Sequence, residues 1–128
     1  MKMKNSEVLT RCSTLAGIIR KGEKYPVKFS FALVKNLKAL QAAGADLEEA
    51  RNALLDCYNV KDADGKPAYK TSGKIEIAEG CEGEWKKSMQ ELLDIEVEVP
   101  VHPVSVSVLD GLAISADMLY GCDFMLTE

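Results

Sequence analysis

This 128-residue sequence contains only one histidine, and its four cysteines form no close pair. Structural zinc sites usually draw their ligands from close Cys and His pairs, so we predict no metal site and no other cofactor. No apolar signal-peptide core follows the first residues, which leads us to expect a reducing compartment. There the thiols act as small buried hydrophobic groups: Cys12, Cys57, Cys81 and Cys122.

Long apolar runs are missing as well. A membrane span needs about 18–20 consecutive apolar residues, and because no stretch approaches this length we expect no membrane partner. Hydrophobic residues still make up 47% of the chain, which excludes a disordered chain and suffices for one domain core. The sequence therefore predicts a single cytoplasmic domain, residues 1–128.

Catalytic motifs are absent too. The sequence has no phosphate-binding loop, no dinucleotide fingerprint and no serine-hydrolase elbow. His102 stands between Val101 and Pro103, which favours a structural or surface residue over a general base. We therefore do not predict an enzyme. The alternative is a cysteine-dependent enzyme in which the fold pairs His102 with Cys81 or Cys122.

Helical periodicity dominates the N-terminal half, and we expect helices over residues 5–58. The first is opened by Asn5 or Ser6 and ends at Lys21-Gly22. Because Pro26 disfavours helix, we predict a short extended stretch over 25–29. Ser30 then caps a long helix towards Tyr58.

A heptad seam runs along this long helix, which is typical of lengthwise packing against another helix. Gly44 either lies inside one continuous helix or marks a hinge between two, and we favour one helix because the seam keeps its register. The seam exceeds what the first helix can cover, so we predict a homodimer or higher homo-oligomer; the alternative is internal packing. Its residues are Leu33, Leu37, Leu40, Gly44, Leu47, Arg51, Leu54 and Tyr58.

The C-terminal half changes period. We expect a turn or hairpin over 61–77 with a short strand at its end, and then a helix, strands and a terminal helix within 82–126. Alternating residues predict strands over 95–99 and 104–108, with a third pairing segment at 112–114. Ser115 caps the last helix. The fold class is therefore α+β, with long N-terminal helices packed on a small antiparallel sheet formed by the C-terminal half and a short C-terminal helix.

Charge is divided along the chain. Residues 1–42 contain nine Lys and Arg against two Glu, and the remainder contains seven basic against eighteen acidic residues, for a net charge of -4. Lysines interleaved with Tyr25 and Phe29 can hold the phosphates of a small ligand and stack a base. General nucleic-acid binding is not expected, because the whole chain is acidic. The candidate ligand residues are Lys24, Tyr25, Lys28, Lys35 and Lys38.

Acidic residues gather around the helix predicted near Trp85 and the strand after it. They could imitate a phosphate backbone and occupy a nucleic-acid-binding groove on another protein. The alternative is that they form the solvated side of an amphipathic strand and discourage edge pairing. The candidate acidic face consists of Glu91, Asp94, Glu96 and Glu98.

Several segments in a fixed order carry a resemblance: 1–9, 26–36, 49–51, 61–67, 92–99 and 114–115. In this order the chain resembles an uncharacterised family of short phage and prophage proteins. It departs from them at the cysteines and at 101–108, where such proteins are more charged. The resemblance implies expression in the cytoplasm of an infected bacterium. No catalytic motif accompanies it, so no residue inherits a role.

A small phage protein without catalytic residues is expected to act by binding. Our leading hypothesis is an accessory protein that antagonises a host defence function. It would do so by binding a host protein or by sequestering a small nucleotide-like signal. The alternative is an accessory protein of virion or tail assembly, whose partner is a phage protein.

Overall fold

A computed structural model describes residues 1–60 and 77–128. Contacts divide the chain into two compact units, which we describe one at a time. Unit 1 contains Met1–Gly44 and Glu96–Glu128, and unit 2 contains Ala45–Ile95. The predicted α+β class is confirmed, with long N-terminal helices, a two-stranded antiparallel sheet and a short C-terminal helix.

Unit 1 begins with strand β1 (Lys2–Lys4) and helix α1 (Asn5–Arg20). The helix begins at Asn5, but its N-cap is Lys4 and not Asn5 or Ser6, and the Lys4 amide donates to Glu7 Oε1 at 3.0 Å. Its C-cap is Lys21, and Gly22 follows with a positive φ of 67°. Glycine adopts this left-handed conformation without the steric penalty of a Cβ, which explains the predicted stop.

Helix α2 (Val27–Tyr58) is one continuous helix of 32 residues, so the favoured reading of Gly44 is confirmed. The predicted extended stretch over 25–29 is wrong, because the helix begins at Val27 and not after Ser30. The Pro26 carbonyl accepts the Ser30 amide at 3.0 Å. Proline is tolerated at a helix start, where an N–H has no intrahelical partner in any case.

The antiparallel sheet pairs β1 with β2 (Glu96–Glu98), in the register Lys2↔Glu98, Met3↔Val97 and Lys4↔Glu96. The strand predicted around residue 97 is thus present. Its partner comes from the first residues of the chain, where three residues are too few to show a strand period. Both charged positions of β2 lie opposite a lysine, and the apolar Met3 is buried.

The predicted strand over 104–108 is wrong beyond its start. Strand β3 is only Val104–Ser105, and a 3₁₀ helix, η1 (Val106–Leu109), replaces the rest. The Ser105 hydroxyl accepts the Ser107 amide at 3.3 Å and caps this turn. The segment 112–114 pairs with no strand in the described part of the chain.

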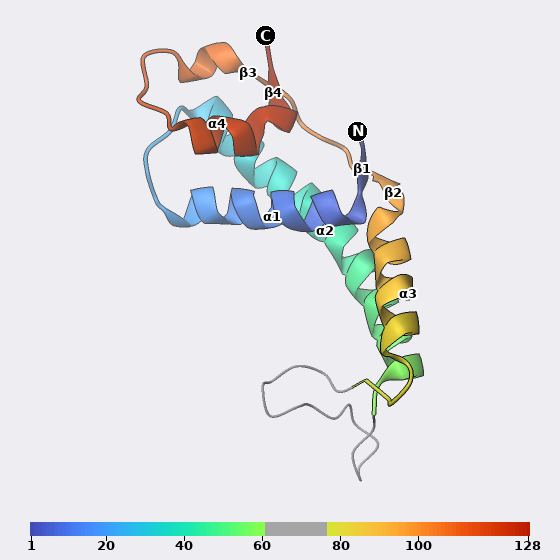
Figure 1. The fold of residues 1–128 in the computed structure, drawn as a ribbon. Helices are drawn as coiled ribbons and strands as arrows, with labels where there is room; N and C mark the ends of the chain where they lie inside the picture. The colour runs from blue at the N-terminus through green and yellow to red at the C-terminus, as the bar shows by residue number, and fades with distance from the viewer. Residues whose placement is uncertain (61–76) are drawn as a thin grey trace. The chain divides into compact units, whose positions relative to one another are not determined.

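The chain then ends on helix and a short strand. Helix α4 (Ala116–Cys122) is capped as predicted, since the Ser115 hydroxyl accepts the Met118 amide at 3.2 Å. A 3₁₀ turn, η2 (Asp123–Met125), leads to β4 (Leu126–Thr127), which pairs parallel with β3. In unit 1, α4 lies alongside α1 (Figure 1).

One hydrophobic core holds unit 1 together. It joins both long helices to segments of the C-terminal third of the sequence, and its residues are at most 8% exposed. Phe29 and Leu40 of α2 and Leu15 of α1 are fully buried. The other members are Met3, Val8, Ile18, Ala32, Leu33, Val99, Val104, Leu109, Cys122 and Met125.

Unit 2 consists of the C-terminal part of α2 and helix α3 (Glu82–Asp94), which lie side by side (Figure 1). The Tyr58 and Trp85 rings meet edge to face at 6.3 Å, and the Tyr58 carbonyl accepts the Ala78 amide at 2.7 Å. The predicted helix around Trp85 is confirmed. The predicted turn or hairpin over 61–77 lies outside the described residues, apart from Ile77, which bridges Asn59.

Candidate binding surface on helix α2

The outer face of α2 carries a stripe of exposed apolar side chains. Val27 is 84% exposed, Phe31 56% and Val34 45%. Steps of four and three residues place them along one side of the helix. Folding leaves this stripe in water although the opposite face of α2 is buried in the core. Such exposure on a rigid helix is typical of a protein contact surface.

Lysines lie beside this stripe. Lys28, Lys35 and Lys38 are all exposed, and their helical spacing places them on the same side of α2 as Phe31. The Lys35 Nζ lies 5.6 Å from the centroid of the Phe31 ring, within cation–π range. No acidic residue occupies the first turn of α2. We call Val27, Lys28, Phe31, Val34, Lys35 and Lys38 the α2 surface.

A groove of about 560 Å³ opens beside the N-terminal end of this surface. Val27, Lys28 and Phe31 form one side of it. No carboxylate lines it among the described residues, and Lys28 gives it a positive charge. The other lining residues are His102, Pro103, Val104, Ser105, Ser107 and Val108.

His102 connects the groove to α2. Its ring meets the Phe31 ring edge to face, with centroids 5.4 Å apart and an interplanar angle of 80°. Its main chain is held by the buried side chain of Asn36, which donates to the His102 carbonyl at 2.9 Å and accepts the His102 amide at 2.6 Å. His102 therefore forms a wall of the groove, and both its main chain and its ring contact α2.

The predicted ligand residues are not brought together as a group. Of the five, Lys28 lines the groove, and Lys35 and Lys38 lie on the α2 surface. Lys24 is exposed in the segment before α2. Phe29 cannot stack a base, because it is fully buried.

Tyr25 is also engaged within unit 1. It packs against Phe29 at 5.4 Å and donates to Glu23 at 2.9 Å. Partial burial and, secondly, this hydrogen bond to Glu23 raise the pKa of the Tyr25 hydroxyl. The prediction of base stacking by these two rings is therefore wrong for Phe29, and the exposed aromatic ring of this region is Phe31.

The heptad seam follows the inner side of α2 in unit 1. Leu40 is fully buried in the core and Leu37 packs against it, so the chain itself covers this stretch. In unit 2, Leu47 is buried, Leu54 and Tyr58 are half-buried and Arg51 is exposed. In unit 1, internal packing accounts for the seam residues, and the homo-oligomer stays a prediction.

The candidate acidic face divides between the units. Glu91 and Asp94 lie on α3 in unit 2, whereas Glu96 and Glu98 lie on β2 in unit 1. Cross-strand neighbours share one side of a sheet, so each β2 glutamate stands beside a lysine of β1. This pairing reduces the negative potential of the strand and weakens the comparison with a phosphate backbone.

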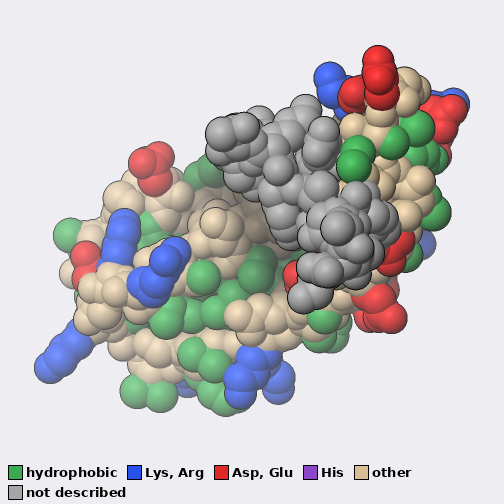
Figure 2. Space-filling model, turned by 90° about the horizontal axis from the view of Figure 1, so that it is seen from below, with side chains coloured by type: hydrophobic (Ala, Val, Ile, Leu, Met, Phe, Trp, Pro, Cys, Tyr) green, Lys and Arg blue, Asp and Glu red, His purple; other side chains and the backbone are tan. Residues whose placement is uncertain are grey.

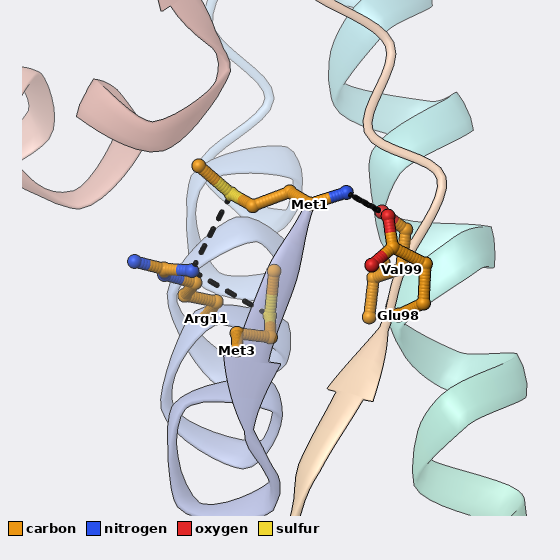
Figure 3. Close-up of polar contacts among 5 residues, drawn as sticks. All are labelled: Met1, Met3, Arg11, Glu98 and Val99. Atoms are coloured by element: carbon orange, nitrogen blue, oxygen red, sulfur yellow. Dashed lines mark hydrogen bonds and ion pairs between the residues drawn. The ribbon is translucent and has the colours of Figure 1, made fainter.

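Glu98 makes a further contact at the sheet edge. The Met1 ammonium lies 2.8 Å from Glu98 Oε1 and 2.8 Å from the Val99 carbonyl (Figure 3). The hydrogen bond from this ammonium, followed by its charge, lowers the pKa of the Glu98 carboxyl.

A second groove of about 500 Å³ lies between α1 and the C-terminal segment of unit 1, next to Arg11. The Arg11 guanidinium is already engaged: it pairs with Glu7 at 3.3 Å and lies 4.8 Å above the Phe124 ring. Its Nη1 also contacts the sulfur atoms of Met1 and Met3 (Figure 3). These contacts stabilise the unit and leave the guanidinium little capacity for a ligand.

The thiols offer little support for cysteine chemistry. Cys122 is 1% exposed, and burial raises its pKa to about 11, which disfavours the nucleophilic thiolate. The pairing of His102 with Cys81, which belongs to the other unit, stays a prediction. Within residues 1–60 and 77–128, no three metal-ligating side chains gather in one place. No helix in these ranges is both long enough and apolar enough to cross a bilayer.

Sequence patterns alone do not place Phe31, Asn36 and His102 in one site. A signal was present, because α2 carries apolar residues on two opposite sides and only one side can face a core. Val27, Phe31 and Val34 form the second stripe. No local sequence pattern could predict the contact between Asn36 and His102, since 66 residues separate them.

On the face shown in Figure 2, hydrophobic side chains lie between small groups of Lys and Arg side chains. A nucleic-acid backbone favours a continuous basic stripe, which this face does not show.

No protein-family model, curated protein or solved structure matches the chain. The resemblance to short phage proteins therefore remains a prediction.

Proposed function

We propose that this protein is a non-catalytic accessory protein that binds a partner protein through the α2 surface. The partner presents apolar side chains flanked by carboxylates. The observation that carries the proposal is Phe31, which is 56% exposed on a continuous helix beside Lys28 and Lys35. An exposed aromatic side chain is typical of the anchor residues of protein interfaces.

Energetics favour such a contact. Full burial of a Phe side chain contributes about 1.5–3 kcal/mol, and Phe31 retains more than half of its exposure for a partner to cover. Lysines beside it would steer an acidic partner and raise the association rate. Because α2 is already folded, binding orders few additional groups.

The length of the stripe favours a protein over a small ligand. From Val27 to Lys38 the helix rises about 16 Å, and the groove covers only the first part of this distance. A small phosphorylated ligand could contact Lys28 and His102 but would leave Val34 and Lys38 uncovered. A protein segment lying along the helix covers the whole α2 surface.

The resemblance to phage proteins supplies the biological setting of the proposal. In that setting the partner belongs to an infected bacterium, and its binding antagonises a host defence function. The assembly alternative places the same surface against a virion or tail protein. No residue of the α2 surface distinguishes these two partners, so the identity of the captured partner decides between them.

Affinity capture from infected cells tests the proposal, with mass spectrometry of both proteins and small molecules. The tagged full chain is compared with Phe31→Ala and with Leu9→Ala, a control on α1 with a similar exposed fraction of 49%. We expect a partner that Leu9→Ala retains and Phe31→Ala loses. The captured partner is then purified and titrated directly against all three proteins.

Three results count against the proposal. An identical catch for all three proteins would remove Phe31 from the interface. Equal direct affinities would do the same. A nucleotide recovered instead of a protein, and lost on Lys28→Glu, would replace the partner protein with a small phosphorylated ligand in the groove.

A further inference from the structure

Asn36 is a polar residue in an apolar environment. It lies on the inner side of α2, is 1% exposed, and has the fully buried Ala32 and Leu40 one turn before and after it. A buried amide costs free energy unless its donors and acceptor are paired. Leucine has a similar shape and would fill this site without that cost. Packing alone therefore does not explain why an amide side chain occupies this position.

The bonds of Asn36 go mainly to one residue. Its Nδ2 donates to the His102 carbonyl at 2.9 Å and its Oδ1 accepts the His102 amide at 2.6 Å. A further contact from Nδ2 reaches Met125 Sδ at 3.5 Å. The two bonds to His102 satisfy its main chain in both directions, as a neighbouring strand would.

His102 needs such a partner because it lies outside the strands of the described chain, between β2 and β3. Prolines at 100 and 103 flank it and donate no hydrogen bond to a sheet. The Asn36 side chain therefore fixes this segment against α2. It also fixes the Cα atom from which the His102 side chain extends. The centroid of the His102 ring lies 5.4 Å from that of the Phe31 ring.

We infer that Asn36 is a positioning residue for the α2 surface: by holding the His102 main chain, it sets the His102 ring against Phe31 and shapes the groove. This inference rests on the proposed function for its biological meaning. The contact between Phe31 and His102 can be measured without any partner. Asn36 itself stays buried and touches no ligand.

The first test measures that contact in the free protein by NMR. Asn36→Leu keeps the side-chain volume and removes both bonds to His102. We expect the ring-current shift between Phe31 and His102 to disappear and the His102 amide to exchange faster with solvent. Leu15→Ala, a core substitution on α1, is the destabilised control: it should keep the ring-current shift between Phe31 and His102, and it should speed exchange of the core amides together rather than that of the His102 amide alone.

Asn36→Ala provides a second variant if Asn36→Leu folds poorly. Its methyl group removes both bonds to His102 without placing a larger apolar group or a charge in the core. We expect the ring contact to be lost as in Asn36→Leu. If the folded variants keep the wild-type ring-current shift and amide exchange, Asn36 does not position His102 and the inference is overturned.

The second test measures binding, with a synthetic helical peptide as the probe. The peptide carries leucines at i, i+4 and i+7 with glutamates beside them, to match the α2 surface. We expect Asn36→Leu and His102→Ala each to weaken binding by about tenfold, a factor typical of a lost buried interaction. Leu15→Ala should bind like wild type in its folded fraction.

The double variant separates positioning from general destabilisation. If Asn36 acts through His102, the combined loss in Asn36→Leu with His102→Ala stays close to that of either single variant. Full additivity would overturn the inference. If the wild-type protein does not bind the peptide while the NMR contact still depends on Asn36, the proposed partner chemistry fails and the positioning of His102 stands.

Discussion

Gly121 of α4 lies so close to Thr14 of α1 that a Cβ added to the glycine would stand 2.5 Å from Thr14 Cγ2. Real Cβ contacts do not reach this distance, so a side chain at 121 forces the two helices or the threonine to move. Thr14 cannot rotate freely, because its hydroxyl donates to the Thr10 carbonyl at 2.9 Å. The close approach of α1 and α4 therefore depends on glycine.

Gly121→Ala should lower the stability of unit 1. Overpacking typically costs about 1–3 kcal/mol, which exceeds the gain of about 0.5–1 kcal/mol from replacing glycine by alanine in a helix. Thermal and urea unfolding followed by circular dichroism would measure the change. Adding Thr14→Ser removes Cγ2 and should restore wild-type stability or more.

Gly17→Ala is the matched control for this pair. Gly17 lies on α1 with no atom within 4 Å of an added Cβ, so alanine there should stabilise the protein by about 0.5–1 kcal/mol. If Gly121→Ala stabilised the protein as Gly17→Ala does, the close helix contact would be wrong.

Sequence patterns identified the helices well, because helix period and end signals are local. Gly22 and Ser115 marked a stop and a start correctly, and the register of α2 across Gly44 held. The failures have tertiary causes. β1 has only three residues and forms because β2 is opposite it. The alternation after Val104 ended in a 3₁₀ turn because Ser105 bonds locally to Ser107.

The candidate site was harder to predict than the fold. Charge and spacing drew attention to Lys28, Lys35 and Lys38, which lie exposed on α2, but the exposed ring beside them is Phe31 and not Phe29. Burial decides between Phe29 and Phe31, two residues apart in sequence and on different sides of the helix. Periodicity shows apolar residues on both sides of α2. Only the packing of the C-terminal third of the chain shows which side is covered.

Alanine should therefore lower the free energy of unfolding far more at Phe29 than at Phe31. Phe29 is fully buried, and Phe29→Ala should lower the free energy of unfolding by about 3–5 kcal/mol through loss of transfer free energy and a cavity. Phe31→Ala should lower it by only about 1 kcal/mol, because this ring is 56% exposed and loses only its contacts with His102 and Lys35. Urea unfolding of both variants would compare them, and a large loss in Phe31→Ala would mean that this ring supports the fold.

Glu98 should make stability depend on acid pH. The Met1 ammonium lowers the pKa of this carboxyl in the folded protein, so the folded state binds the proton less tightly than the unfolded state. The contact therefore stabilises folding above the unfolded carboxyl pKa and is lost as the pH falls through the folded value. Since the pair is exposed, salt should weaken it.

NMR titration of the Glu98 side chain would show the lowered pKa directly. Glu98→Gln should remove this part of the acid dependence by lowering the stability at neutral pH slightly, towards its value in acid, because the lost ion pair is exposed. Glu96→Gln is the control, because Glu96 lies on the same strand without contacting the ammonium. An ordinary Glu98 pKa would show that the ion pair does not persist in solution.

Cys122 should resist alkylation in the folded protein. Its side chain is 1% exposed, and burial raises its pKa to about 11, so at pH 8 both access and thiolate are lacking. Cys57 is exposed at the end of α2 and should react with iodoacetamide within the same assay. Mass spectrometry of peptides from folded and urea-unfolded protein would quantify both sites. Equal labelling of Cys57 and Cys122 in the folded protein would mean that the core of unit 1 opens around α4.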